Sequence, residues 1–191
     1  MNGPPATAAW RHLGDRDGFE VVFLSREDGG LVVRGQATAL EDDQTWGVRY
    51  AVTLDEGWVT RRAHVVCRSA AGRHEVRLES DGAGRWRVDG AQAPELDGCL
   101  DVDLEASAFT NAFPVRRLAL GVGARSEAPA AYVRAPGLAV ERLEQSYHRL
   151  DDGGDGPRFD YASPRFDVRA ELVYDRSGLV LDYPGIAVRV A

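Results

Sequence analysis

The stretch that most constrains the fold is residues 96–122, LDGCLDVDLEASAFTNAFPVRRLALGV, because its hydrophobic period changes halfway along. From Leu100 to Glu105 apolar and acidic residues alternate strictly. A period of two is typical of a strand with one buried and one solvated face. The alternation therefore predicts a strand at 100–105 whose leucines and valine face the core.

The second half of this stretch predicts a helix over residues 109–120, the one plausible helix of the chain. Thr110 and Asn111 are of the residue types that cap helix N-termini. Pro114 suits a first helical turn, where its missing N–H would have no partner. Apolar residues cover most of the circumference and leave two arginines as the only charges. We therefore expect a short, largely buried helix that plugs the core of a β-structure.

The rest of the chain consists of short strand-like runs separated by turns rich in glycine and aspartate. Residues 31–40 and 46–54 predict an antiparallel hairpin, and 58–68 predict a longer strand with partly apolar faces on both sides. The runs amount to roughly a dozen to fifteen strands, more than an open twisted sheet usually holds without curling or splitting. The predicted fold class is all-β, mostly antiparallel, curled around one helix near residues 109–120. The predicted core combines apolar residues of the helix and of the strands: Phe109, Phe113, Val115, Leu118, Val65, Val76, Leu100, Val102 and Leu104.

Two runs in the central stretch, GCLDVDL at 98–104 and FTNAFPVRRL at 109–118, resemble the bacterial family described as putative glycolipid-binding, formerly a domain of unknown function. The resemblance continues through Gln145, Tyr147, Ser163 and Pro164 to the closing YDRSGLVLDYPGIAVR, so it covers almost the whole chain. It implies a spiral β-roll, a long sheet wrapped around a single helix. It also implies a role in carrying lipid, by likeness to bacterial lipoprotein carriers, and it supplies no catalytic residues.

Composition limits the class of protein. With 191 residues, 44% of them hydrophobic, the chain is long enough for one well-formed core, and we expect a single domain over residues 1–191. The formal net charge of −7 disfavours nucleic-acid binding, which needs a concentrated basic surface. The N-terminal run MNGPPATAAWRHL has no signal-peptide pattern and no run of about eighteen apolar residues occurs, so we expect a cytoplasmic protein without a transmembrane segment.

Metal and cofactor chemistry has little support in the sequence. Cys67 and Cys99 are too few for a disulfide framework and lie in strand-like contexts, so we expect reduced, buried thiols. The four histidines are scattered and no CxxC or HxH pair occurs, which argues against a zinc site. The glycines lack the strand-to-helix setting of a nucleotide loop, and no cofactor is predicted.

Asp101, Asp103 and Glu105 share one face of the predicted strand and have two interpretations. Paired carboxylates can bind a metal or perform glycoside chemistry. Polar residues at alternate positions are also what the solvated face of any strand contains, and this interpretation is the stronger one.

Arg116 and Arg117 also have two interpretations, because neighbouring arginines on an apolar helix cannot both be buried without partners. In the structural interpretation one or both pair with acids such as Asp101, Asp103 or Asp182, or reach solvent at the end of the roll. In the functional one, an arginine faces the mouth of a cavity and binds a phosphate or sugar headgroup through its bidentate fork.

The sequence favours non-catalytic binding of a glycolipid or similar acyl-chain ligand in an apolar cavity of the curled sheet. The predicted ligand-binding residues are Arg61, Arg116 and Arg117 at the polar end and Trp58 and Tyr183 in the wall. A hydrolase acting on a lipid or glycoside through Asp101 and Asp103 is the first alternative, and a structural or partner-binding module is the second. A deep apolar cavity would favour the carrier, convergent polar groups in a cleft the enzyme, and a flat apolar patch the partner-binding module.

Overall fold

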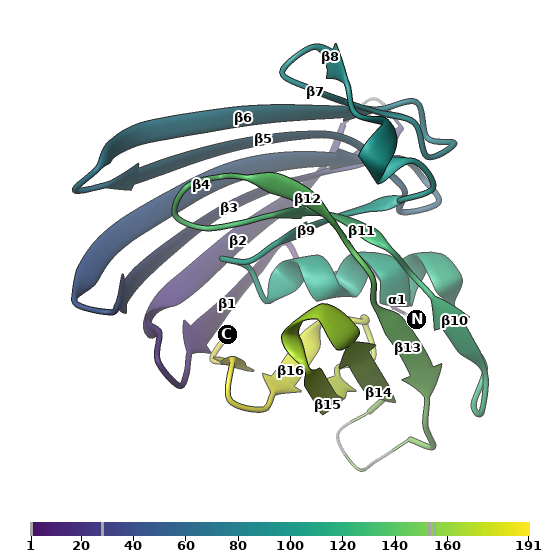
Figure 1. Ribbon diagram of the computed structural model, residues 1–191. Helices are drawn as coiled ribbons and strands as arrows, with labels where there is room; N and C mark the ends of the chain where they lie inside the picture. The colour runs from purple at the N-terminus through teal and green to yellow at the C-terminus, as the bar shows by residue number, and fades with distance from the viewer. Residues whose placement is uncertain (1, 28, 153, 155) are drawn as a thin grey trace.

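The computed structural model describes residues 2–27, 29–152, 154 and 156–191, and it is a curled β-roll around one short helix (Figure 1). Six long strands, β1 to β6, form an antiparallel meander, and the C-terminal strands join its β1 edge through β17. A separate three-stranded sheet lies inside the curve of the large sheet. Its central strand β11 pairs with β12 in antiparallel and with β9 in parallel orientation. Within the described residues the large sheet has 14 strands in the order β10-β13-β14-β15-β16-β17-β1-β2-β3-β4-β5-β6-β7-β8.

The bounds of the elements are as follows. The meander and its continuation are β1 Thr7–His12, β2 Asp17–Glu27, β3 Gly30–Glu41, β4 Gln44–Leu54, β5 Thr60–Ser69, β6 Gly72–Ser80, β7 Trp86–Val88 and β8 Ala91–Gln92. The central and C-terminal elements are β9 Asp101–Leu104, α1 Ala112–Leu118, β10 Arg125–Glu127, β11 Ala130–Val133, β12 Val140–Leu143, β13 Ser146–Arg149, β14 Arg158–Ser163, β15 Val168–Tyr174, β16 Val180–Tyr183 and β17 Ala187–Arg189. Short 3-10 turns occur at Pro94–Leu96, Phe109–Asn111 and Pro164–Phe166.

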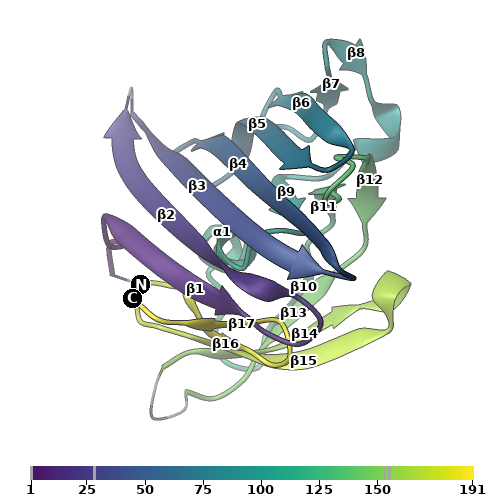
Figure 2. The same cartoon turned by 90° about the vertical axis from the view of Figure 1, so that its left-hand side faces the viewer.

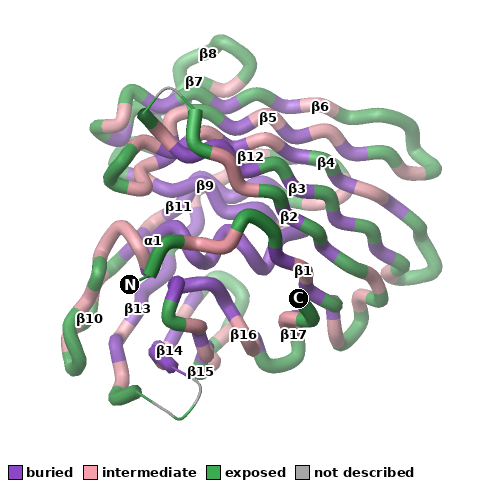
Figure 3. The backbone as a smooth tube through the Cα atoms, turned by 180° about the vertical axis from the view of Figure 1, so that it is seen from behind, coloured by how far each residue is buried: buried purple, intermediate pink, exposed green. Residues whose placement is uncertain are grey.

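Along the long strands buried residues alternate with more exposed ones, as the burial colours of β2 to β6 show (Figure 3). In β3 and β4 the buried positions are apolar, whereas β2 buries Glu20 and exposes Phe19 and Phe23. The predicted hairpin is confirmed: β3 pairs with β4 in antiparallel register from Leu31 opposite Leu54 to Glu41 opposite Gln44. One side of this sheet covers α1 and the other faces outward (Figure 2). The predicted fold class, all-β with one short buried helix, is confirmed.

The helix has the predicted position but is shorter and is capped differently. A 3-10 turn at Phe109–Asn111 leads into α1, which ends at Leu118 because Ala119 adopts a left-handed conformation with φ of 45°. The prediction that Thr110 or Asn111 caps the N-terminus is wrong, since neither side chain makes a capping hydrogen bond at α1. Instead the buried carboxylate of Glu20, on β2, accepts the backbone N–H groups of Ala108 and Phe109 at 2.9 and 3.2 Å. A negative charge at this end suits the helix dipole.

Two hydrophobic clusters meet at the helix. Phe109 and Phe113 belong to the larger cluster under β1 to β6, and Val115 belongs to a tyrosine-rich cluster under β13 to β16. Seven of the predicted core residues are buried, whereas Leu100 and Leu118 are only half-buried. The helix therefore joins the two walls of the roll, as expected of a core plug.

The prediction of a solvated face on the strand at 100–105 is wrong. Asp101 and Asp103 are buried, and Glu105 is half-buried. The reason is that β9 lies inside the roll. One of its edges pairs with β11, and at the other edge Thr60 of β5 donates its backbone N–H to the Leu100 carbonyl and accepts the Val102 N–H on its hydroxyl oxygen. Alternation distinguishes two faces of a strand, but both faces of this one are covered.

Two other features bear on the class of protein. Cys67 and Cys99 are both free and buried, as expected. Among the described residues no helix is long and apolar enough to cross a bilayer. The expectation of one domain over residues 1–191 stays a prediction, and residues 1, 28, 153 and 155 lie outside the described part.

Candidate functional site

A cavity of about 360 Å³ opens beside β9, between the ends of β1 and β17 and the strands β14 and β15. This volume lies at the small end of the range of about 300–1,000 Å³ typical of ligand sites. Both apolar and polar side chains line it: His12, Leu13, Asp15, Arg16, Glu41, Asp103, Leu104, Glu105, Ser107, Asn111, Tyr132, Leu143, Tyr161, Ser163, Phe166, Val168, Tyr183 and Ile186, with several glycines and alanines. These residues come from both ends of the chain and from its middle, so the curl of the sheet assembles the site.

Asp103 is the buried carboxyl group of this cavity. Thr110 Oγ1 donates a hydrogen bond to Asp103 Oδ1 at 2.9 Å, and burial raises the pKa of this carboxyl to about 6, with smaller contributions from the nearby Asp101 and Glu105. Beside it, Asn111 Oδ1 accepts a hydrogen bond from the Tyr147 hydroxyl at 3.1 Å. The inner wall therefore presents a carboxyl group that is partly protonated near neutral pH.

Three tyrosines form flat walls of the cavity. The Tyr161 ring contacts the Tyr183 ring edge to face, with centroids 5.8 Å apart. The Tyr161 hydroxyl donates to Gln145 Oε1 at 3.0 Å, which leaves the oxygen lone pairs available as acceptors. Tyr132 packs on Phe166 at 5.5 Å nearer the rim. Burial raises the pKa of all three phenols, so they stay neutral.

His12 supplies a polar atom without a partner. Its Nδ1 is buried and makes no hydrogen bond to any residue that the structure describes. Burial, together with the nearby Arg16, lowers the pKa of His12 to about 4, so the ring is neutral at physiological pH. A buried polar atom without a partner costs stability, which a bound hydroxyl group would recover.

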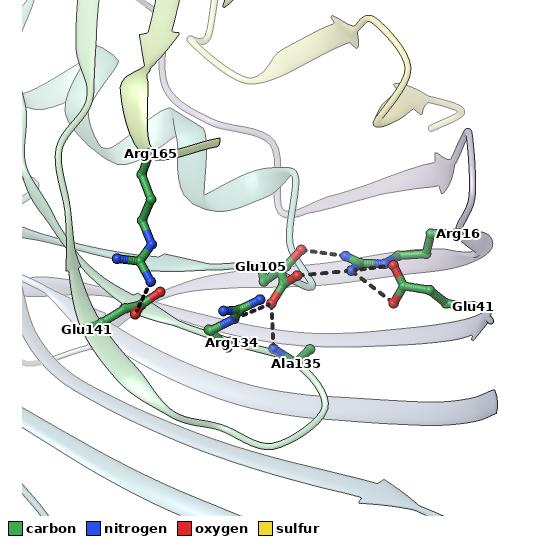
Figure 4. A network of polar contacts seen from close by, with 7 residues as sticks. All are labelled: Arg16, Glu41, Glu105, Arg134, Ala135, Glu141 and Arg165. Carbon is green, nitrogen blue, oxygen red and sulfur yellow. Dashed lines mark hydrogen bonds and ion pairs between the residues drawn. The ribbon is translucent and has the colours of Figure 1, made fainter. Parts of the chain in front are cut away.

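Charged residues hold the rim in place (Figure 4). Arg16 donates to the Glu105 backbone carbonyl at 2.6 Å and pairs with the Glu41 carboxylate at 3.0 Å. The Glu105 carboxylate accepts the Ala135 N–H at 2.8 Å and lies 3.9 Å from Arg134. The rim thus has its charges largely compensated before any ligand arrives.

The five predicted ligand-binding residues lie in four places. Tyr183 lines the cavity. Arg117 forms a bidentate pair with the buried Asp101, with Nε and Nη2 at 3.0 and 2.6 Å from the two oxygens, as the structural interpretation expected. Arg116 stacks on Trp58 at 4.2 Å and donates to the backbone carbonyls of Asn2 and Ser177. Arg61 lies in a separate groove, 3.8 Å from Asp55.

Sequence reasoning does not identify His12 and Tyr132 as site residues, and it considers Asp103 only as a carboxylate of the hydrolase alternative. The two aspartates were considered together, but the structure separates them: both oxygens of Asp101 are occupied by Arg117, whereas Asp103 lines the cavity. His12 and Tyr132 carry no local signal, because only the tertiary structure brings β1, β9 and β11 to one cavity.

Replacing Asp103 by asparagine is expected to stabilise the protein at pH 7.5 and to have little effect near pH 4. The pKa of Asp103 lies near 6 in the folded protein against 3.8 as an ordinary value, so the folded state binds this proton more tightly than the unfolded chain. Asp103 therefore lowers stability above pH 6, and this penalty disappears as the pH falls toward 4. The difference between the two proteins should reach at most about 3 kcal/mol, and urea unfolding at several pH values measures it.

Glu20 and His12 are present in both proteins, so their titrations cancel in the Asp103 comparison. An asparagine variant that is less stable than the parent at pH 7.5 would show instead that the hydrogen bonds at this site hold the carboxylate ionised.

Comparison with known proteins adds three findings. The family model described as putative glycolipid-binding matches residues 7–189. The crystal structure of a DUF1089 family protein from Pseudomonas aeruginosa is 32% identical in sequence, with a TM-score of 0.76 over 100% of this chain and 95% of that chain. A comparison with curated proteins found no match.

Proposed function

We propose that this chain, which belongs to the family described as putative glycolipid-binding, binds the sugar headgroup of an amphiphilic glycolipid in the cavity beside β9 without transforming it. The observation that carries the proposal is the composition of the cavity wall. A neutral histidine with an unpartnered nitrogen, a buried carboxyl group and three tyrosines face one small space. Hydroxyl-rich rings need hydrogen-bonding groups at the edges and flat aromatic faces, and this wall offers both.

The volume and the rim suggest how such a ligand is oriented. A cavity of about 360 Å³ suits a headgroup rather than two full acyl chains. Phe166, Val168 and Ile186 line the cavity, and Phe166 and Ile186 are partly exposed. The headgroup would enter first, with the acyl portion leaving along these apolar side chains.

This orientation differs from the one that the sequence suggested. There the polar end was assigned to arginines and the cavity was expected to be apolar. In the proposed site the hydroxyl and imidazole groups are neutral, and the Asp103 carboxyl, with a pKa of about 6, is partly ionised. A carboxylate repels a phosphate but accepts hydrogen bonds from sugar hydroxyls, so the ligand class is an uncharged glycoside rather than a phosphate ester.

The phenol of Tyr161 provides the sharpest test. Removing its hydroxyl in Tyr161→Phe should weaken binding of a matching glycoside about tenfold, the effect of losing one buried hydrogen bond. The matched control is Tyr174→Phe, since Tyr174 is equally buried but its hydroxyl bonds to the backbone oxygen of Asn111. Calorimetric titration with octyl glucoside, a monogalactosyl diacylglycerol and palmitate, below the melting temperature of all variants, measures the affinities.

The protein should bind the glycolipid most tightly, the alkyl glycoside less tightly and palmitate most weakly. At about 100 times Kd a ligand should stabilise the protein by about 2.7 kcal/mol, a shift that thermal unfolding resolves. Native mass spectrometry of protein purified from its own host identifies any retained lipid. Protein that is empty and is stabilised by no member of this panel would remove the proposal and favour a partner-binding module.

A second candidate function is glycoside hydrolysis, favoured by one observation. Asp103, whose pKa near 6 suits a general acid, lines the same cavity as Glu105. This pair, Asp103 and Glu105, differs from the pair that the sequence suggested for a hydrolase, which was Asp101 and Asp103. Mass analysis of the glycolipid after incubation separates the two functions: a released sugar that disappears in Glu105→Gln supports the enzyme, and unchanged glycolipid with retained binding supports the carrier.

A further inference from the structure

Large apolar side chains are exposed on the outer face of the sheet, away from the cavity. Phe19, Val21 and Phe23, at alternate positions of β2, are 50%, 40% and 57% exposed, and Val190, beyond the end of β17, is 55% exposed. Figure 2 looks onto this outer face, with α1 behind the sheet. Three large side chains in a row on an outward strand face are uncommon in a protein that exposes them only to water.

The strand register joins these residues into one patch. Val21 lies opposite Ala9 of β1, whose carbonyl accepts the backbone N–H of Val190 at 2.8 Å. Phe19 lies opposite Arg11, which in turn lies opposite Val188 of β17. The exposed side chains and the half-buried Val188 therefore share a surface across β17, β1 and β2, which we call the outer patch (Phe19, Val21, Phe23, Val188 and Val190).

The charges beside the outer patch are basic, although the chain as a whole carries 30 acidic and 23 basic residues. Arg11, Arg34 and Arg49 are exposed and point to the same face. Carboxylates lie at the margins of this face: Asp17 begins β2 two residues before Phe19, and Asp182 of β16 lies opposite Val188. Glu27, at the end of β2, pairs with Arg34 at 2.8 Å.

A shallow groove adjoins the outer patch. It has a volume of about 340 Å³ and is lined by Phe23, Arg34, Arg49 and His64, among others. Guanidinium groups beside an apolar side chain are what a phosphate-bearing lipid headgroup and its first methylenes need.

We propose that the outer patch docks this protein onto the surface of an anionic lipid membrane, with Phe19 and Phe23 entering the headgroup boundary and Arg11, Arg34 and Arg49 contacting the lipid phosphates. Aromatic burial and electrostatic attraction act together in such peripheral binding. This surface is separate from the cavity beside β9, so the proposal does not depend on what the cavity binds.

Charge decides between a membrane and a second copy of the chain as the occupant. Among the described residues that line the groove, Arg34 and Arg49 are accompanied by no carboxylate, so a second copy seated through the same groove would place arginine against arginine. An anionic lipid surface instead complements them, even though the net charge of −7 opposes binding from a distance.

The test is flotation with large unilamellar vesicles. At low salt the protein should float with vesicles of equal parts phosphatidylglycerol and phosphatidylcholine and should not float with pure phosphatidylcholine. The variant with Phe19→Ser and Phe23→Ser should bind the anionic vesicles about tenfold more weakly. The variant with Arg34→Gln and Arg49→Gln should lose about thirtyfold, from about 1 kcal/mol for each arginine at the surface.

Val122→Ser is the matched control, because Val122 is 60% exposed but lies in the loop after α1, outside the outer patch. It should float like the parent. Failure of the parent to float, equal flotation with neutral vesicles, or unchanged flotation of the double serine variant would each overturn the proposal. If sedimentation shows that the parent is a dimer and that the same serine substitutions make it monomeric, the outer patch serves self-association instead. Flotation needs no glycolipid, so its result is independent of the titrations at the cavity.

Discussion

Replacing Arg117 by alanine is expected to lower the free energy of unfolding by about 3–5 kcal/mol. Arg117 donates to both oxygens of Asp101, and the Asp101 side chain is buried. Removing the arginine leaves a buried carboxyl group without its counter-charge, and this costs more than the pair itself contributes. Denaturant unfolding at pH 7.5 measures the loss.

The pH dependence of this variant gives a second measurement. Burial already raises the pKa of Asp101, and Arg117 opposes that shift. Without Arg117 the folded pKa should rise further above the unfolded value, so part of the lost stability should return as the pH falls below that raised pKa. A loss of stability that is the same at pH 5 and pH 7.5 would mean that removing Arg117 does not raise the pKa of Asp101 into this pH range.

Arg169→Ala is the matched control for Arg117→Ala. Arg169 also contacts both oxygens of a carboxylate, with Nε and Nη2 at 3.2 and 2.9 Å from Asp160, but its side chain is 71% exposed. Because solvent screens an exposed pair, the expected cost is below about 1 kcal/mol. The two variants separate the effect of burial from the geometry of the pair. Equal losses would show that burial is not what makes the Asp101 pair important.

Replacing Phe113 by alanine is expected to lower the free energy of unfolding by about 3–5 kcal/mol. Phe113 is fully buried on α1, and its ring contacts Phe109 at 5.6 Å and Trp58 at 6.5 Å between centroids. The substitution removes apolar contact area and leaves a space that the surrounding sheet closes only in part. Thermal and denaturant unfolding should both report the loss.

Phe23→Ala serves as the control for Phe113→Ala, since it removes the same atoms from a side chain that is more than half exposed. Its cost should be about 1 kcal/mol or less, as for surface substitutions generally. If Phe113→Ala proves no more costly than Phe23→Ala, the helix does not plug the roll, and the two clusters are held together by the strands alone.

Much of the fold follows from local sequence patterns. The alternation in 31–40 and 46–54 predicts strands because a pleated backbone places successive side chains on opposite faces, and β3 and β4 confirm it. The number of such runs requires a curled sheet. The change of period in residues 96–122 places the helix, because an apolar segment around Pro114 suits a helix better than a strand.

The candidate site could be predicted only in part. Tyr183 was assigned to the wall and lines the cavity, and Asp103 was recognised as a possible functional carboxylate. His12 and Tyr132 were not recognised as site residues, because nothing in their immediate sequence distinguishes a residue that lines a cavity from one packed in the core. The resemblance to a family supplied a ligand class but no residues.

Local sequence patterns are enough to predict the all-β class, the position of the helix and the arginine pair on an apolar surface, since these depend on residues within a few positions of one another. The partners of those residues depend on how distant segments of the chain pack together. The tertiary structure buried Asp101 and paired it with Arg117, and it brought Glu20 from β2 to Ala108, at the start of the 3-10 turn that leads into α1. A strand's period shows that its two faces differ, but the curl of the sheet determines whether the second face meets water or another layer of protein, and that curl depends on pairing between strands far apart in the chain.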